Sequence, residues 1–533
     1  MAFKRFGLMI CVASTNVMQI KRIKHLIDLM KKMGYNYLEL VIDDVYTIDE
    51  EPYFGYLRGG YSHEELRELD DYAYANGIEL VPCIQTLAHL THLVKLPAYY
   101  DIVDIDDILM IDEPRTYELV DRMFKSIRSD FRTNIVNIGM DEAHKVGLGN
   151  YLDKHGYTNR FDLLLRHLSK VLEIAEKYGF KAHMWSDMFF RLASKGEYYK
   201  KGLEMPQEVI DKVPENVALC YWDYCEHEME PEMFDEMFRQ HAQFGREVWF
   251  AGGAWCWNGF APHNNFSIQS MKMAIEKAKK YDIENVMITL WANEGNECPF
   301  YATLPSLYAI KQYSEGNFDE ASIRKGFKEM FGMEFDDFML TDLPNVNSNN
   351  KEMLRVESTA KTLLYNDCFL GWKDSQLEKV DHIPYDEYAK KLRAVAPTMG
   401  EFKYIFDKLI ALCDVLEVKA ELGLRTRRAY KANDKAELKK LMDDYEEAVR
   451  RIEIFRKISR DIWMMENKPY GWTIHQIRLG GLMSTITDQR ERIGEYLEGK
   501  VDSIPELEEV ILPYADWGLQ YNEYRGLVTV SNL

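Results

Sequence analysis

Two adjacent acids, Asp141 and Glu142, follow a short apolar run over residues 134–138. The run predicts a buried strand, and Gly139 lets the backbone bend directly after it. Acids at the end of a buried strand are costly unless they are paired, solvated or used in chemistry. In an α/β barrel, that end of the strand is where catalytic groups collect. The alternative is that Asp141 caps the following turn and Glu142 pairs with a nearby lysine, and this stretch alone leaves both interpretations open.

Strand-like apolar runs alternate with helix-like amphipathic runs up to about residue 320. The eight predicted strands span residues 6–12, 37–42, 78–84, 134–138, 180–185, 217–222, 247–251 and 286–291. Eight strand–helix units in about 300 residues predict a (β/α)₈ TIM barrel. A doubly wound sheet would need a glycine-rich phosphate turn after the first strand, and residues 13–16 are not one.

The predicted helices between these strands include residues 18–33, 62–75, 114–127, 161–178, 233–244 and 267–281. Ser62 and Glu65 have the spacing of a capping box. After about residue 327 the strand runs stop and long charged helices follow, such as residues 435–459. The sequence therefore predicts an α/β barrel over residues 1–325 and an all-α C-terminal domain over residues 326–533.

Acids, amides and aromatic rings recur where the predicted strands end. The candidate site residues beyond Asp141 and Glu142 are His89, Trp185, Asp187, Trp222, Tyr224, Trp255, Trp257, Trp291, Asn293, Glu294 and Glu297. Tryptophan faces stack on sugar C–H surfaces, whereas acids and amides bind hydroxyl groups, so this set predicts a small-ligand pocket. Taken singly, a tryptophan here is better explained by packing, Asp187 by a helix cap, and Glu294 and Glu297 by solvent-facing loops.

The bulk composition restricts the partners of the chain. A net charge of −21 argues against nucleic acid and anionic membranes, because both need a basic surface. No apolar run approaches 18 residues, so no transmembrane helix is expected. The eight cysteines include no CxxC pair and indicate free buried thiols in the cytoplasm. Residues 4–13 mimic a weak secretion signal, but a first strand explains them better.

The ordered series of motifs resembles glycoside hydrolase family 20, the β-N-acetylhexosaminidases. Its parts are residues 139–142 after a strand, tryptophans at the ends of strands five to eight, and acids after Trp291. Residues 85–90, 185–190 and 221–224 are similar to a bacterial branch of the family with a helical C-terminal domain. The resemblance extends into the tail, around residues 467–472.

The resemblance implies hydrolysis of terminal β-linked GlcNAc or GalNAc by substrate-assisted retention, with no cofactor or metal. Glu142 would be the general acid and then the base, and Asp141 would orient the 2-acetamido group. Tyr224 would bind the acetamide carbonyl, and His89 would steer the acid. The family also implies a tryptophan wall from Trp185, Trp222, Trp255 and Trp291, and hydroxyl binding by Asn293, Glu294 or Glu297.

Three departures from the family pattern concern the choice of sugar. Most members carry a small α/β domain before the barrel, whereas here the first predicted strand begins almost at once. The family usually places an arginine at the end of strand one, where this chain has residues 14–16, Ser-Thr-Asn. Asn293 also stands where the family has an acid. The chemistry of Asp141 and Glu142 is unaffected by these changes.

Parts of the sequence also resemble three other functional classes. Residues 141–144 spell the DEAH box of certain helicases, but no phosphate loop accompanies it. A metal-dependent barrel hydrolase or isomerase would draw on His89, His92, Glu142, His183, Asp187 and His263. No HxH or HExxH cluster supports that reading. A non-catalytic N-acetyl-sugar-binding barrel stays open, as do a homodimer and an approach of Trp472 or Arg478 to the rim of the site.

Overall fold

The computed structural model describes residues 3–225, 229–513, 519 and 524–528, and its first part is a closed barrel of eight parallel strands. The strands are β1 (Arg5–Cys11), β2 (Tyr37–Val41), β3 (Glu79–Cys83), β6 (Ile135–Asn137), β7 (Lys181–Trp185), β8 (Val217–Trp222), β9 (Val248–Gly253) and β10 (Asn285–Leu290). The barrel closes because β1 pairs with both β2 and β10. All eight predicted strands and the barrel are confirmed.

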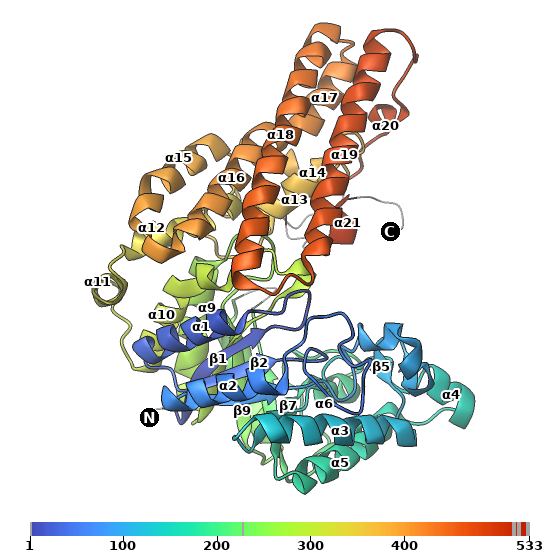
Figure 1. Ribbon diagram of the computed structural model, residues 1–533, viewed down its shortest axis with the longest axis vertical. Helices are drawn as coiled ribbons and strands as arrows, with labels where there is room; N and C mark the ends of the chain where they lie inside the picture. Colours follow the sequence, from blue (N-terminus) through green and yellow to red (C-terminus); the bar gives the residue numbers. More distant parts are fainter. Residues whose placement is uncertain (1–2, 226–228, 514–518, 520–523, 529–533) are drawn as a thin grey trace.

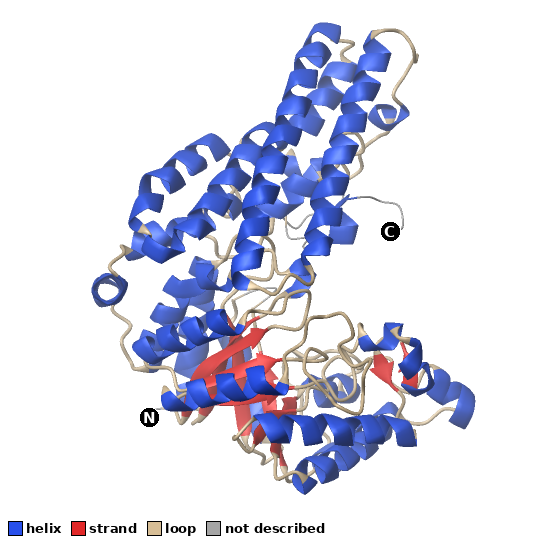
Figure 2. Ribbon diagram, in the orientation of Figure 1, coloured by secondary structure: helices blue, strands red, loops and turns tan. Residues whose placement is uncertain are grey.

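Helices surround the barrel (Figures 1 and 2). They are α1 (Ile20–Met33), α2 (His63–Ala75), α3 (Pro114–Asp130), α5 (Arg160–Lys177), α8 (Pro231–Ala242), α9 (Asn264–Lys280) and α10 (Leu304–Ser314). Most of them bury one apolar face, whereas α10 is buried along almost its whole length. The predicted capping box at α2 forms, since Ser62 accepts from the Glu65 N–H and the Glu65 carboxylate accepts from the Ser62 N–H.

The long loops at the mouth of the barrel carry short elements that the hydrophobic pattern does not predict. They are η1 (Leu93–Lys95), η2 (Pro97–Ile102), the antiparallel pair β4 (Val103–Ile105) and β5 (Ile108–Leu109), α4 (Asn150–His155), α6 (Asp187–Ala193), α7 (Gln207–Ile210), η3 (Asn293–Gly295) and η4 (Phe300–Thr303). Such segments span only one or two turns, too short for a periodic signal. Two of them, α6 and η3, lie beside the cavity described below.

The remainder of the described chain is helical, as predicted. Its elements are α11 (Glu320–Phe331), α12 (Phe335–Met339), η5 (Leu340–Asn345), α13 (Thr359–Tyr365), α14 (Asp374–Leu377), α15 (Tyr385–Val395), η6 (Ala396–Thr398), η7 (Gly400–Phe402), α16 (Lys403–Lys419), α17 (Leu422–Lys431), α18 (Lys435–Glu466), α19 (Trp472–Leu497), α20 (Pro505–Glu508) and α21 (Tyr524–Val528). Helices α16, α18 and α19 pack side by side (Figure 1).

The helical region stands on the barrel, with the near ends of α18 and α19 against the loops of the barrel mouth (Figure 1). The boundary after residue 325 stays a prediction, and this position falls inside α11. Within the described residues, every helix is either too short or too polar to span a bilayer.

Candidate active site

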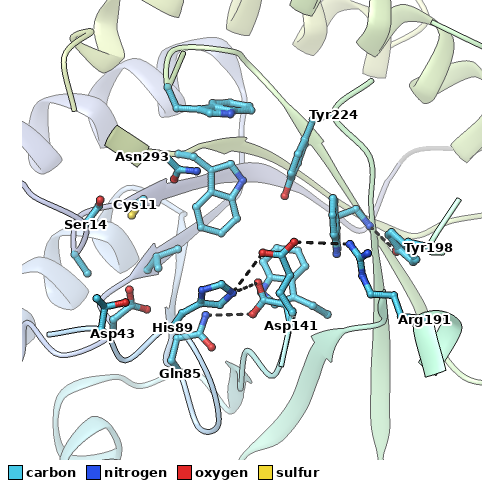
Figure 3. A pocket seen from close by; sticks show the side chains of 18 of the residues that line it. Cys11, Ser14, Asp43, Gln85, His89, Asp141, Arg191, Tyr198, Tyr224 and Asn293 are labelled. Atoms are coloured by element: carbon cyan, nitrogen blue, oxygen red, sulfur yellow. Dashed lines mark hydrogen bonds and ion pairs between the residues drawn. The ribbon is translucent and has the colours of Figure 1, made fainter. Parts of the chain in front are cut away.

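A cavity of about 470 Å³ opens at the carboxyl ends of the barrel strands. Cys11, Val41, Trp185 and Trp222 are the last residues of β1, β2, β7 and β8, and all four line it (Figure 3). The sequence-predicted residues on its wall are His89, Asp141, Glu142, Trp185, Trp222, Tyr224, Trp257, Trp291 and Asn293. The fold therefore brings together side chains that are up to about 200 positions apart in the chain.

Asp141 is held by two neighbours from the loop after β3. The His89 Nε2 atom lies 3.2 Å from Asp141 Oδ2, and Gln85 Nε2 donates to Asp141 Oδ1 over 3.3 Å (Figure 3). The charge of Asp141 raises the pKa of His89 to about 10, against the opposing effect of burial. Burial would raise the pKa of Asp141, but the charge and hydrogen bond of His89, with the hydrogen bonds from the backbone and from Gln85, together lower that pKa. At neutral pH the two groups form an ion pair.

Several residues near the acid pair have a positive φ angle, a backbone conformation that residues other than glycine rarely adopt. The φ angles are 59° at His89, 70° at Met140 and 50° at Glu142, and Gly139 has φ 68°. A β-carbon on Gly139 would lie 2.0 Å from Gln85 Oε1. Strained residues persist only where surrounding contacts hold them, and they concentrate at functional sites. The glycine noted in the sequence thus permits the close approach of Gln85 to the acid pair.

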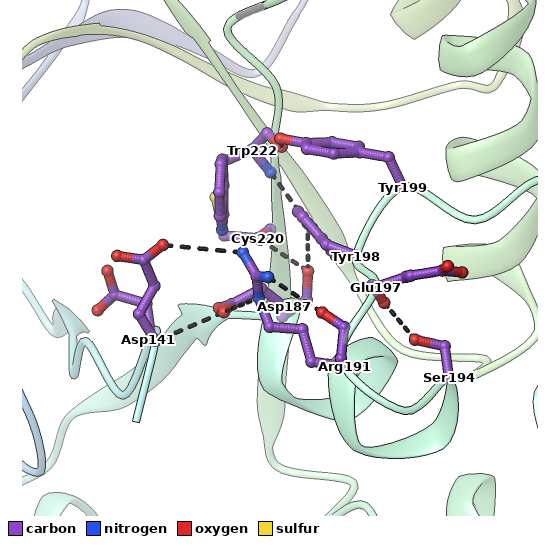
Figure 4. Close-up of polar contacts among 12 residues, drawn as sticks. Asp141, Asp187, Arg191, Ser194, Glu197, Tyr198, Tyr199, Cys220 and Trp222 are labelled. Carbon is purple, nitrogen blue, oxygen red and sulfur yellow. Dashed lines mark hydrogen bonds and ion pairs between the residues drawn. The ribbon is translucent and has the colours of Figure 1, made fainter. Parts of the chain in front are cut away.

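Glu142 is held from the other side by α6. Asp187 Oδ2 accepts from the Glu142 backbone N–H at 3.2 Å and from Arg191 Nε at 3.1 Å (Figure 4). Arg191 Nη2 lies 3.7 Å from Glu142 Oε1, and His89 Nε2 lies 3.7 Å from Glu142 Oε2. Burial and the charge of Asp141 raise the pKa of Asp187 to about 7. The carboxylate of Glu142 is therefore flanked by two cationic groups and still 42% exposed toward the cavity.

Aromatic rings form one wall of the cavity. The Trp185 and Trp291 rings are 6.0 Å apart, Tyr224 stacks on Trp222 at 5.4 Å, and Trp257 meets the Tyr224 ring edge-on at 5.6 Å. Burial raises the pKa of Tyr224 well above its usual value, so its hydroxyl stays protonated and can donate. Such a wall fits the apolar face of a sugar ring.

The opposite end of the cavity is polar and comes from the loops after β1, β2, β3 and β10. Ser14, Asp43, His92 and Asn293 line it. Burial and the neighbouring Asp44 raise the pKa of Asp43 to about 7. Arg58, from the loop after β2, donates to the Ser14 carbonyl at 2.9 Å.

Four predicted site residues lie behind the cavity wall. Trp255 stacks on Trp257 at 4.1 Å and donates to the Tyr224 carbonyl. Asp187 is fully buried beneath Glu142. Glu294 and Glu297 turn toward the helical region, where both pair with arginine. Spacing along a loop does not determine these side-chain directions, and their roles in direct sugar contact have no support from the geometry.

Several lining residues were not named as candidates in the sequence. Asp43 and Gln85 directly follow predicted strands but are not among the candidates. Arg191, Tyr198 and Tyr199 lie in the segment after β7, which carries no periodic pattern. The one available signal was the four-residue spacing of Asp187 and Arg191, which is typical of an ion pair on a helix.

A metal-dependent site has one possible location among the described residues. His89, Asp141 and Glu142 present ligand atoms within 4.8 Å of one another. With a pKa of about 10, His89 would have to lose a proton against its ion pair before it could bind a metal. Of the other residues of the metal hypothesis, His183 stacks on Trp249 inside the barrel and His263 contacts the Glu357 carbonyl. Asp187 instead accepts from the Glu142 backbone N–H, and His92 lines the polar end of the cavity.

Three solved structures illustrate what this chain is similar to. An exo-β-N-acetylglucosaminidase from Vibrio harveyi is 16% identical with TM-score 0.47, and the match covers 62% of this chain and 58% of that chain. A β-N-acetylhexosaminidase from Bacteroides fragilis is 16% identical with TM-score 0.46, covering 62% and 71%. A chitobiase from Flavobacterium johnsoniae is 15% identical with TM-score 0.48, covering 95% and 74%.

Two family models match the chain itself. The catalytic domain of glycosyl hydrolase family 20 matches residues 3–235, and the glycoside hydrolase 20C C-terminal domain matches residues 336–523. The first match contains Asp141, Glu142 and the strands β1 to β8, and the second contains α13 to α20. Together the two matches span well over half of the chain, which therefore belongs to glycoside hydrolase family 20.

Proposed function

We propose that this protein hydrolyses terminal β-linked N-acetylhexosaminides by substrate-assisted retaining catalysis. The observation that carries the proposal is the adjacent pair Asp141–Glu142 at the end of β6, facing an aromatic cavity closed by Trp185 and Trp291. The size of the cavity, about 470 Å³, suits a small ligand such as one sugar ring with its acetamide group.

Glu142 acts first as general acid and then as general base. In the first step the 2-acetamido oxygen attacks C1, the glycosidic bond breaks, and Glu142 gives its proton to the leaving oxygen. In the second step Glu142 takes a proton from water while the water oxygen bonds to C1. The bond between C1 and the oxazolinium oxygen breaks in the same step, which restores the acetamide, and the proton taken from water restores the acid form of Glu142. The exposure of Glu142 toward the cavity supports this role.

Asp141 orients the acetamide and stabilises the positive charge of the intermediate. Both tasks need an ionised carboxylate, and the ion pair with His89 keeps the pKa of Asp141 low. The hydrogen bond from Gln85 fixes the other oxygen. The protonated hydroxyl of Tyr224 is our candidate donor to the acetamide carbonyl, and His89 orients the acid pair.

The first test is turnover of aryl β-GlcNAc and aryl β-GalNAc by the wild type and by Glu142→Gln, with and without a thiazoline inhibitor. Loss of the acid is expected to lower kcat by about 10²- to 10⁴-fold, most strongly for poor leaving groups. Glu173→Gln, at an exposed position of α5, is the matched control and should retain activity. Inhibition by thiazoline would support participation of the acetamide group.

Two other results would redirect the assignment. The cluster of His89, Asp141 and Glu142 favours metal-dependent hydrolysis as the second candidate. Activity that disappears on dialysis against a chelator and returns with a divalent metal would establish that mechanism. A folded wild type that binds GlcNAc-thiazoline yet turns over neither sugar would identify a sugar-binding protein instead.

We further propose a cytoplasmic location in a bacterial cell. All eight cysteines lie within the described residues, and all are free and buried, which suits a reducing compartment. The net charge of −21 argues against nucleic-acid and membrane partners. Cell fractionation tests the location, and recovery in the medium would contradict it. The molar mass from light scattering tests whether the protein forms a homodimer.

A further inference from the structure

We propose that the helical region completes the sugar site, and that Arg478 on α19 is a positioning residue for the loop that carries Trp291 and Asn293. The inference rests on the proposed function, because it assigns a role within the same cavity. Trp291 and Asn293 line the cavity, whereas Arg478 does not. Arg478 acts on the site only through the residues that follow Asn293.

Arg478 joins three groups of this loop. Its Nη1 atom donates to Glu297 Oε1 at 2.9 Å and also to the Glu294 carbonyl, and its Nη2 atom donates to Glu294 Oε2 at 3.3 Å. The arginine side chain is 11% exposed and the Glu297 side chain 2%. A planar guanidinium with several donors can hold a loop in one geometry, which a point charge does less well.

Other helices of the region contact the same loop. Lys361 on α13 forms an ion pair with Glu297 over 2.8 Å, and both side chains are almost fully buried. Lys408 on α16 donates to the Glu297 carbonyl, and His475 on α19 lies 2.8 Å from the Gly295 carbonyl. The buried carboxylate is thus balanced by Lys361 and Arg478, two cations of the helical region, and it keeps a lowered pKa despite its burial.

The loop needs such support because its backbone is strained. The φ angles of Glu294, Gly295 and Asn296 are 54°, 104° and 53°, three successive residues in the left-handed region. A β-carbon at Gly295 would lie 2.8 Å from Arg478 Nη1, so the arginine packs directly against the glycine. Strain of this kind persists only when surrounding contacts determine the conformation.

The helical region also holds the loop after β1, at the polar end of the cavity. The segment 467–471 joins α18 to α19, and the Lys468 N–H donates to the Val17 carbonyl at 2.7 Å. Gly471 packs against the Thr15 carbonyl, so closely that a β-carbon would approach to 1.9 Å. These contacts support the loop that carries Ser14.

The test compares Arg478→Met and Arg478→Lys with Arg490→Met. Arg490 lies on the same helix but pairs with exposed Glu446, so its variant is the matched control. For each folded protein we would measure KM and kcat for aryl β-GlcNAc, calorimetric binding of GlcNAc-thiazoline, the melting temperature, and hydrogen exchange of residues 291–297. The exchange measurement does not depend on activity.

Arg478→Met is expected to raise KM and the thiazoline Kd about tenfold or more, since small displacements of positioning groups have large effects. Faster exchange over residues 291–297 should accompany it, Arg478→Lys should recover part of the loss, and Arg490→Met should leave all three unchanged. If Arg478→Met does not fold, the same measurements are made on Glu294→Gln and Arg478→Lys. Smaller increases in KM, in the thiazoline Kd and in the exchange of residues 291–297 are then expected.

A purely structural role would lower the melting temperature but leave KM, Kd and the exchange of residues 291–297 as in the wild type. That result would overturn the inference while the proposed function stands. A wild type that neither binds thiazoline nor turns over substrate would instead remove the proposed function. Exchange of residues 291–297 would then still show whether Arg478 positions the loop.

Discussion

Replacement of Asp141 by asparagine removes the charge that keeps His89 protonated. At the observed separation of 3.2 Å, the attraction amounts to about 5 kcal/mol for an effective dielectric constant of about 20. The His89 side chain is 37% exposed, so solvent screening reduces the usable part to about 2–3 kcal/mol. That energy corresponds to about two pKa units. The pKa of His89 should therefore fall from about 10 in the wild type to about 8 or below in the variant.

The titration is measured by long-range ¹H–¹⁵N correlation of the imidazole groups, with His89→Gln used to assign the signal. Asp107→Asn is the matched control, because Asp107 raises the pKa of His89 less than Asp141 and Glu142 do. It should lower that pKa by about half a unit or less. The same Asp141→Asn protein should lose about 10²-fold or more in kcat, through lost stabilisation of the intermediate.

Two results would refute this reasoning. One is a wild-type His89 that titrates near its ordinary value of 6.5, which would mean that the ion pair does not persist in solution. The other is an unchanged pKa in Asp141→Asn, which would assign the shift to Glu142 or to another neighbour.

Two further predictions concern stability. Gly139→Ala should lower the free energy of unfolding by about 2–3 kcal/mol in urea titrations, because alanine is strained in the left-handed region and would displace Gln85. Gly179 has φ 74° but open space around it, so Gly179→Ala should lower the free energy of unfolding by only about 1 kcal/mol. Equal losses in the two variants would contradict the packing argument. The ion pair should also give a pH window. The lowered pKa of Asp141 contributes stability above its usual 3.8 and loses it in acid, while the raised pKa of His89 contributes fully below 6.5 and loses it as pH rises through about 10. The stability difference between the wild type and Asp141→Asn should therefore be largest between pH 3.8 and pH 6.5, where both contributions are present. A difference that grows toward pH 10 would count against the ion pair.

The barrel was predictable from the sequence because its signals are local. Each strand is a short run of buried apolar residues, each surrounding helix shows one apolar face, and caps such as Ser62 mark where helices begin. Once eight such units are counted, the topology places all strand ends at one mouth. The positions of Asp141, Glu142, His89 and the tryptophans around one cavity follow from that rule.

The tertiary structure decided where the side chains in the loops point. Trp257 reaches the cavity while Trp255, two residues earlier, packs behind it. The family resemblance predicts Glu297 as a sugar-binding acid. In the structure its carboxylate instead pairs with Lys361 and Arg478, about 60 and 180 positions away, and points toward the helical region. Arg191 had no periodic signal because α6 spans only about two turns. A local pattern records burial and period, whereas these choices depend on partners that only the folded chain brings within reach.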